Sequence, residues 1–145
     1  MSVGEKIGLR LEQPAFTPDH LGLQVLNGEE FNAAHKTLSK YCKLVHNEMI
    51  HGRRNRVYRF TKPASSAGIS FPGIEIFEPK PDAKPSTLRP GIEHVAFVVG
   101  DLPRVQMQLE RLGLIAKDAT YSLGRFLKTK LIDGIEIEFR EKPLV

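Results

Sequence analysis

The chain has 145 residues, of which 41% are hydrophobic and 26% charged, and its formal net charge is +4. This length fits one domain, and this composition excludes a disordered or fibrous protein. No apolar run reaches the roughly 20 residues of a membrane span, and the N-terminal residues lack the apolar stretch of a signal peptide. The single cysteine, Cys42, fits a reducing compartment, so we expect a cytoplasmic protein with no membrane partner.

The first predicted elements are a strand over residues 19–25 and an amphipathic helix over residues 28–42. Asn27 can accept hydrogen bonds from the first free amides of the helix, and Glu30 has the spacing to reach back. Apolar side chains then recur at helical spacing. These signals predict both the start of the helix and the face that it buries.

A hairpin should follow, with strands over residues 44–50 and 56–61. Between them lies the basic segment 51–56, which contains three arginines beside a glycine and is typical of a solvated turn. Neither interleaved aromatics nor a recognition helix accompanies it, so we expect no nucleic-acid partner. One of its three arginines is a candidate for facing a ligand.

The first half should end with a strand over residues 73–78. Residues 79–91 contain four prolines and have no apolar periodicity, which favours an extended linker.

The second half begins with a predicted strand over residues 93–99. Asp101 and a proline in the first turn indicate the start of a second helix, and Gly113 suits its left-handed C-terminal cap. Segments 115–121 and 126–132 then predict a second hairpin.

Two pairs of segments repeat along the chain. Residues 19–25 resemble residues 93–99, and Gly-Ile-Glu-Ile occurs at both 73–76 and 134–137. We therefore predict an α+β fold of two βαβββ modules, whose paired, curved mixed sheets form a half-barrel cup with one helix packed on each. The expected boundaries are an N-terminal arm (1–17), module 1 (18–78), a Pro-rich linker (79–91), module 2 (92–140) and a tail (141–145), all within one domain of residues 1–145.

The repeat places chemically useful side chains at equivalent positions. His20 and His94 each follow an acidic residue at the start of an apolar strand, and each closing strand carries glutamates among isoleucines. A lone strand histidine is usually a core residue with one hydrogen bond, but two histidines and two glutamates that recur together suggest a metal site. Imidazole with carboxylate suits Zn, Ni, Fe(II), Mn or Co.

These residues resemble the vicinal oxygen chelate superfamily, which includes glyoxalase I, extradiol dioxygenases, methylmalonyl-CoA epimerase and antibiotic-resistance proteins. The segments 19–23, 47–53 and 91–95 are most similar to the YecM-like proteins, a family regarded as metal-binding without an assigned reaction.

The resemblance implies a metal held by two histidines and a glutamate from each closing strand. It selects His20, Glu78, His94 and Glu138, whereas the internal symmetry of the chain favours Glu75 over Glu78. The reserve ligands are Glu75 and Glu136. Strand alternation prevents Glu75 and Glu78 from facing one metal unless a bulge intervenes.

The resemblance implies a metal-dependent isomerase, lyase or epimerase that acts on a small, oxygen-rich substrate, with Glu138 and Glu78 as the carboxylates that move the proton. Arg53, which keeps the Gly-Arg of the resembling segment 47–53, is a candidate for binding a carboxylate or phosphate of the substrate. The modest positive net charge of the chain favours an anionic substrate. The alternatives are a protein that binds a small molecule or metal without catalysis, and an Fe(II) dioxygenase. A homodimer with exchanged modules is a further alternative to a closed monomer.

The remaining conspicuous side chains have ordinary interpretations. We expect His35 at the boundary of the first helix and His51 exposed in the turn. A catalytic thiolate at Cys42 is not expected, because the negative end of a helix dipole raises a thiol pKa.

Overall fold

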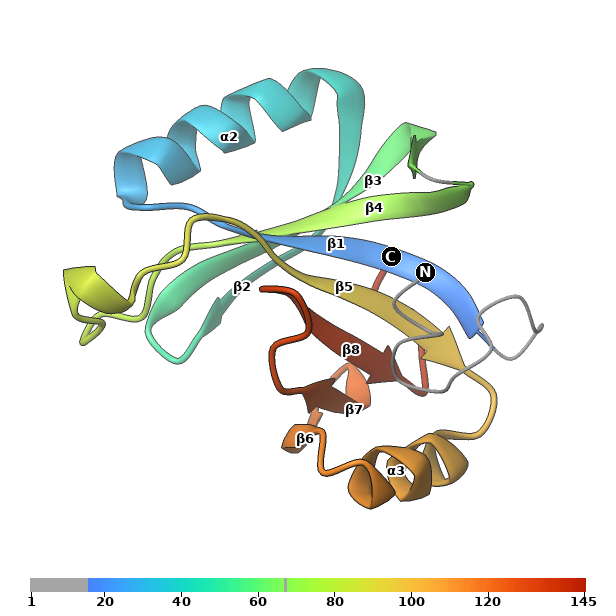
Figure 1. The fold of residues 1–145 in the computed structure, drawn as a ribbon. Helices are drawn as coiled ribbons and strands as arrows, with labels where there is room; N and C mark the ends of the chain where they lie inside the picture. The colour runs from blue at the N-terminus through green and yellow to red at the C-terminus, as the bar shows by residue number, and fades with distance from the viewer. Residues whose placement is uncertain (1–15, 67) are drawn as a thin grey trace. The chain divides into compact units, whose positions relative to one another are not determined.

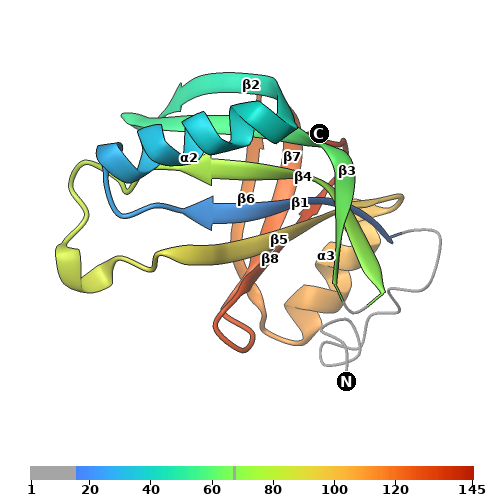
Figure 2. The same cartoon turned by 90° about the horizontal axis from the view of Figure 1, so that it is seen from above.

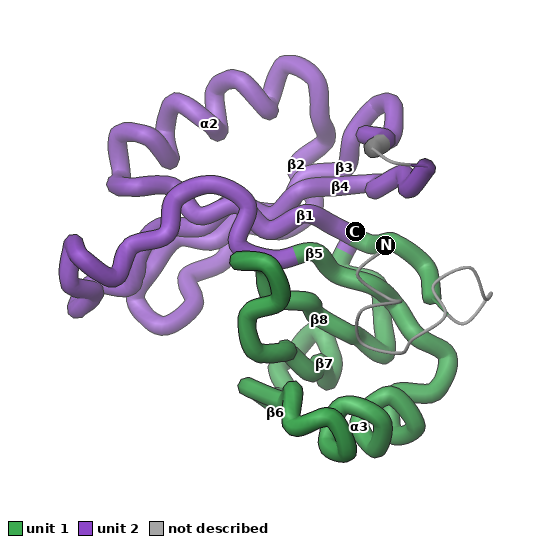
Figure 3. Tube along the Cα trace, viewed as in Figure 1, with its two compact units in different colours: residues 1–19, 95–144 green, residues 20–94, 145 purple. Residues whose placement is uncertain are grey.

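A computed structural model of the chain describes residues 16–66 and 68–145. Most of the predicted N-terminal arm lies outside these residues. The chain divides into two compact units, which Figure 3 colours separately: unit 1 consists of residues up to Asp19 with residues 95–144, and unit 2 of residues 20–94 with Val145. The strands β1 (Phe16–Gln24) and β5 (Gly91–Val99) each contribute residues to both units.

Unit 2 contains one helix beside a mixed sheet, in which the strands lie in the order β2-β3-β4-β1. β1 is parallel to β4, whereas β3 is antiparallel to both β2 and β4. The helix covers one face of these strands (Figures 1 and 2). The elements that follow β1 are α2 (Gly28–Tyr41), β2 (Cys42–Ile50), β3 (Arg53–Ser66) and β4 (Ile69–Phe77).

The start of α2 matches the sequence prediction. The side chain of Asn27 accepts a hydrogen bond from the Glu30 amide at 2.9 Å, and the Glu30 carboxylate accepts one from the Leu26 amide at 2.8 Å. The apolar face of the helix buries Phe31 against the sheet. One buried hydrophobic cluster of unit 2 consists of Val25, Phe31, Tyr58 and Ile76.

Unit 1 also has one helix beside its strands, which lie in the order β5-β8-β7-β6, and β7 is antiparallel to both β8 and β6. Asp101 caps its helix by accepting from the Arg104 amide at 3.1 Å, and Gly113 adopts φ 67° after the last turn, as predicted. The elements after β5 are α3 (Leu102–Arg111), β6 (Ile115–Tyr121), β7 (Gly124–Thr129) and β8 (Glu136–Arg140).

The element order therefore repeats as βαβββ, and the predicted α+β fold of two modules is confirmed. The connection between the modules contains one short 3-10 helix, η1 (Pro85–Thr87). The sequence had predicted an extended linker without a helix here, because of its four prolines. No helix in the described part of the chain combines the length and the hydropathy that a membrane crossing requires.

The basic hairpin differs from its prediction. Its turn is confined to His51 and Gly52, which are exposed and adopt φ 51° and 76°. The arginines predicted for the turn lie on β3 and are half-buried, because their guanidinium groups pack over aromatic rings. Arg54 and Arg56 lie over Phe31 on the helix side.

Candidate metal centre

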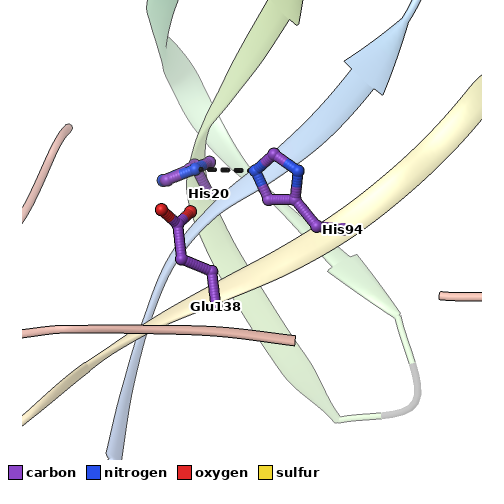
Figure 4. Close-up of side chains that lie close together, drawn as sticks. All are labelled: His20, His94 and Glu138. Atoms are coloured by element: carbon purple, nitrogen blue, oxygen red, sulfur yellow. Dashed lines mark hydrogen bonds between the residues drawn. The ribbon is translucent and has the colours of Figure 1, made fainter. Parts of the chain in front are cut away.

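Two buried histidines meet within unit 2. His20 on β1 is 0% exposed and His94 on β5 is 1% exposed. Their Nε2 atoms are 3.2 Å apart, and the rings meet edge to face with an interplanar angle of 86° (Figure 4). The structure thus brings together the two histidines of the repeated motif, although 73 residues separate them in the chain.

A carboxylate from β4 joins this pair. Oε1 of Glu75 lies 3.3 Å from Nε2 of His94, and its side chain is only 14% exposed. Glu75 also lies opposite Gly22 in the parallel register of β1 and β4. Glu75, a reserve ligand in the sequence prediction, therefore contacts His94 from β4.

A second carboxylate orients the His94 ring. Nδ1 of His94 is 3.3 Å from Oε1 of Glu93. In the tautomer with the proton on Nδ1, the Glu93 carboxylate accepts this hydrogen bond and Nε2 keeps its lone pair. A carboxylate that fixes the tautomer from the far side of the ring is the usual outer partner of a metal-binding histidine.

The spacing of these atoms fits a bound cation. Two ligand atoms at metal–ligand distances of about 2.0–2.1 Å, with angles of roughly 90–110° at the metal, lie about 2.9–3.4 Å apart. The measured separations are 3.2 Å between the imidazole nitrogens and 3.3 Å between nitrogen and carboxylate. Lone pairs that face one another at these distances repel unless a proton or a metal ion lies between them. The donor set is suited to a divalent metal.

An aromatic ring supports His94. The ring of Phe77, at the end of β4, is stacked on the imidazole with centroids 6.0 Å apart and an interplanar angle of 16°. Strand alternation places Phe77 on the same face as Glu75. This face of unit 2, opposite to the helix, therefore carries both the ligand and the ring support.

Glu78, one of the four ligands selected by the resemblance, binds elsewhere. Its Oε1 accepts hydrogen bonds from the Arg54 amide at 3.0 Å and from Nε at 2.8 Å, and its Oε2 accepts from Nη2 at 3.0 Å. These bonds hold the pKa of the Glu78 carboxyl below its ordinary value, although partial burial opposes them. Arg54 also binds Asn32 and Gly28 of α2, so this cluster lies on the helix side of the sheet. No bulge brings Glu78 round to the histidines, because its amide continues the pairing with Arg54.

The closing strand of unit 1 carries the other predicted carboxylates. Glu138 is 4% exposed, and its Oε1 accepts from Nη1 of Arg140 at 3.0 Å. Glu136 is half-buried and lies 3.7 Å from Nζ of Lys128. Alternation puts both glutamates on one face of β8, and Glu138 is the more buried of the two.

His35 and Cys42 have the non-ligand roles that the sequence predicted. His35 is half-buried on α2, and its Nδ1 is hydrogen-bonded to the hydroxyl of Tyr58 at 2.5 Å. Burial lowers the pKa of the His35 imidazole, as does the nearby positive charge of Arg56. The pKa of the Cys42 thiol is raised, as predicted, but the cause is burial.

Sequence reasoning did not assign roles to Glu93 and Phe77. The acidic residue that precedes each motif histidine was a usable signal for Glu93. Strand alternation could have predicted that Phe77 lies on the same face as Glu75, because the two residues are two positions apart. Only the fold shows that its ring stacks on His94.

Comparisons with known proteins agree with this fold. The sequence model of the YecM protein family matches residues 4–141. Among solved structures, the structural-genomics protein EC4020 has a TM-score of 0.77 at 21% identity, over 97% of this chain and 79% of its own. A Streptomyces coelicolor methylmalonyl-CoA epimerase in complex with 2-nitronate-propionyl-CoA has a TM-score of 0.63 at 17% identity, over 86% and 96%.

A methylmalonyl-CoA epimerase from Mycobacterium tuberculosis has a TM-score of 0.62 at 22% identity, over 89% of each chain. These neighbours share the fold of the vicinal oxygen chelate superfamily. No curated protein sequence matched the chain.

Proposed function

The chain belongs to the YecM protein family, and from this premise we propose that it binds one divalent metal ion and uses it to transfer a proton on a small, oxygen-rich substrate. The observation that carries this proposal is the buried pair of His20 and His94, whose Nε2 atoms are 3.2 Å apart, with Oε1 of Glu75 3.3 Å from Nε2 of His94. His20, His94 and Glu138 form a group that could bind a metal ion, and Figure 4 draws the three side chains together.

We assign His20, Glu75, His94 and Glu138 as the ligands. This set replaces Glu78 by Glu75, because the Glu78 carboxylate is committed to Arg54 whereas Glu75 contacts His94. Zn, Ni, Fe(II), Mn and Co are all compatible with two imidazoles and two carboxylates.

The chemistry is an isomerase, lyase or epimerase reaction. When bound, the metal would act as a Lewis acid toward vicinal oxygens of the substrate. Glu93 keeps the lone pair of His94 directed inward, and Phe77 holds the ring. Glu138 is the carboxylate that we assign to proton transfer. Glu78 is not assigned this role, because Arg54 holds its carboxylate on the helix side of the sheet, away from His94.

Metal analysis tests the binding step. Protein freed of metal would be titrated separately with Zn²⁺, Ni²⁺, Co²⁺, Mn²⁺ and, without oxygen, Fe²⁺, and bound metal would be counted after gel filtration. We expect one equivalent in the wild type and loss of it in His20→Ala and His94→Ala. The control is His51→Asn, which removes an exposed histidine and keeps a residue that tolerates positive φ. Absence of stoichiometric metal in the wild type under every loading condition would refute the proposal.

Solvent exchange tests the reaction. One epimerase neighbour is in complex with 2-nitronate-propionyl-CoA and another with methylmalonyl-CoA. Methylmalonyl-CoA is therefore the first probe, followed by hemithioacetals of 2-oxoaldehydes. Proton transfer would introduce deuterium at the acidic carbon in D₂O, which NMR detects. Metal binding without exchange on any probe would favour the non-catalytic binding protein. Oxygen uptake with catechols by the Fe²⁺ form would favour the dioxygenase.

A further inference from the structure

Arg53, at the start of β3, has a buried donor that nothing in the described chain satisfies. Its Nη1 donates to the backbone carbonyl of Glu78 at 3.3 Å. Its Nε is buried and has no hydrogen-bond partner among residues 16–66 and 68–145. A buried N–H of a cation without an acceptor is costly, typically about 1–3 kcal/mol or more. Such a group is explained when an acceptor from outside the chain binds to it.

The position of this guanidinium relates it to the histidines. Cζ of Arg53 lies 4.8 Å from the centroid of the Phe77 ring, and the same ring is stacked on His94. Alternation along β3 separates Arg53 from Arg54, which lies over Phe31 on the helix side. Arg53 is therefore on the histidine side of the sheet, one aromatic ring away from His94.

The free edge of the guanidinium defines the chemistry of the ligand. Nε and Nη2 form the side edge of an arginine, and Nη1 is already used. Two parallel N–H groups on one edge match the two oxygens of a carboxylate in a bidentate pair. Asn55, two residues further along the strand, is 8% exposed and is the next polar side chain on this face.

We propose that Arg53 is a specificity-determining residue that binds a carboxylate of the substrate, and that the substrate is therefore a small acid whose chelating oxygens and carboxylate lie on either side of the Phe77 ring. This inference rests on the proposed metal site and narrows its substrate class from oxygen-rich compounds to oxygen-chelating carboxylates.

The direct test observes Arg53 itself in metal-free protein. The Nε–H signal of Arg53, assigned by its loss in Arg53→Met, is followed by ¹⁵N NMR while succinate is added. We expect a saturable shift of this signal, with no comparable shift of the exposed Arg59 on the same strand. No saturable shift, or equal shifts at Arg53 and Arg59, would overturn the inference.

A second test uses chelating probes on Ni²⁺-loaded protein. Acetohydroxamate provides two oxygens without a carboxylate, and the monohydroxamates of malonic, succinic and glutaric acids add a carboxylate at increasing distance. We expect at least one acid probe to bind about 10- to 100-fold more tightly than acetohydroxamate, as a charge-assisted pair allows. Arg53→Met should abolish this gain and Arg53→Lys should restore part of it, whereas Arg59→Met should keep it.

The outcomes separate the two proposals. Failure of Ni²⁺ to bind contradicts the proposed function and leaves the metal-free NMR test to decide on Arg53. If Ni²⁺ and acetohydroxamate bind but no acid probe gains affinity, or if Arg53→Met loses no more than Arg59→Met, the carboxylate inference alone is wrong.

Discussion

The imidazole of His94 lies directly over the backbone of Gly22. A Cβ atom built on Gly22 would overlap Cε1, Nδ1 and Nε2 of that ring. Gly22 lies on β1 two residues after His20, so both residues point to the same face of the sheet. The close approach of His94 to β1, and with it the pairing of the two histidines, requires a residue without a side chain at this position.

Gly22→Ala should therefore displace His94 and weaken metal binding. We expect the affinity to fall by about 10- to 100-fold, the range seen when groups that orient a ligand are lost. Overpacking should also cost about 1–3 kcal/mol in the free energy of unfolding. Titration with Ni²⁺ and urea unfolding measure the two effects.

The matched control is Gly100→Ala. A Cβ atom at Gly100 meets nothing within 4 Å among the described residues, so this variant should bind Ni²⁺ as the wild type does. Equal affinity of the two variants would mean that the His94 ring can move without harm to the site.

Repetition along the chain is what made much of this structure predictable. The helices have local signals at both ends, and the paired histidine motifs identified His20 and His94 because one strand opens each module. The choice between Glu75 and Glu78 needed more than repetition. It depends on Arg54, which reaches Glu78 through the register of β3 and β4, and no local signal in the sequence fixes such a register.

Acidic residues at equivalent positions of the two modules also have different roles. Glu93 contacts the ring of His94, whereas its counterpart Asp19 accepts a hydrogen bond from the Leu144 amide at 2.9 Å. The partner of each carboxylate comes from a distant part of the chain, so the repeat predicts where an acid lies but not what it binds.

The ligand assignment predicts opposite results for two glutamates of one segment. Glu75→Ala should lower Ni²⁺ affinity by at least about tenfold, because it removes a carboxylate next to His94. Glu78→Ala should leave the affinity within about twofold, because its carboxylate binds Arg54 on the helix side. Competition with a chromophoric chelator measures both. Loss of affinity in Glu78→Ala alone would restore the assignment made from the family resemblance.

Removal of the Glu93 carboxylate, which contacts the far side of the His94 ring, should also weaken metal binding. In Glu93→Ala the proton of His94 is no longer held at Nδ1, so the ring can present a protonated Nε2 to Glu75 and must lose that proton before it binds metal. We expect about tenfold lower Ni²⁺ affinity, with one equivalent still bound at saturation. The control is Glu110→Ala, which removes an exposed carboxylate from α3. Unchanged affinity in Glu93→Ala would show that the ring is held by packing against Phe77 and the strand alone.

The ion pair between Arg54 and Glu78 predicts a pH dependence of stability. Hydrogen bonds from Arg54 lower the pKa of Glu78 from its ordinary value of 4.5. A carboxyl group with a lowered pKa in the folded state stabilises the fold fully above its unfolded pKa, and this contribution is lost as the pH falls through the folded pKa. Glu78→Gln should therefore cost about 1–2 kcal/mol in the free energy of unfolding at pH 7.

The difference between wild type and Glu78→Gln should shrink as the pH falls below about 4.5, because the wild type then becomes protonated and loses the same interaction. Urea unfolding at pH 7 and at intervals from pH 5 to 3 measures this difference. Asp118→Asn provides a comparison, since Asp118 forms a similar pair with Arg125 but its side chain is 42% exposed, against 19% for Glu78. Water screens the exposed pair, so its removal should change the stability less at every pH. A constant difference between wild type and Glu78→Gln from pH 7 to 3 would assign the cost to packing instead of charge.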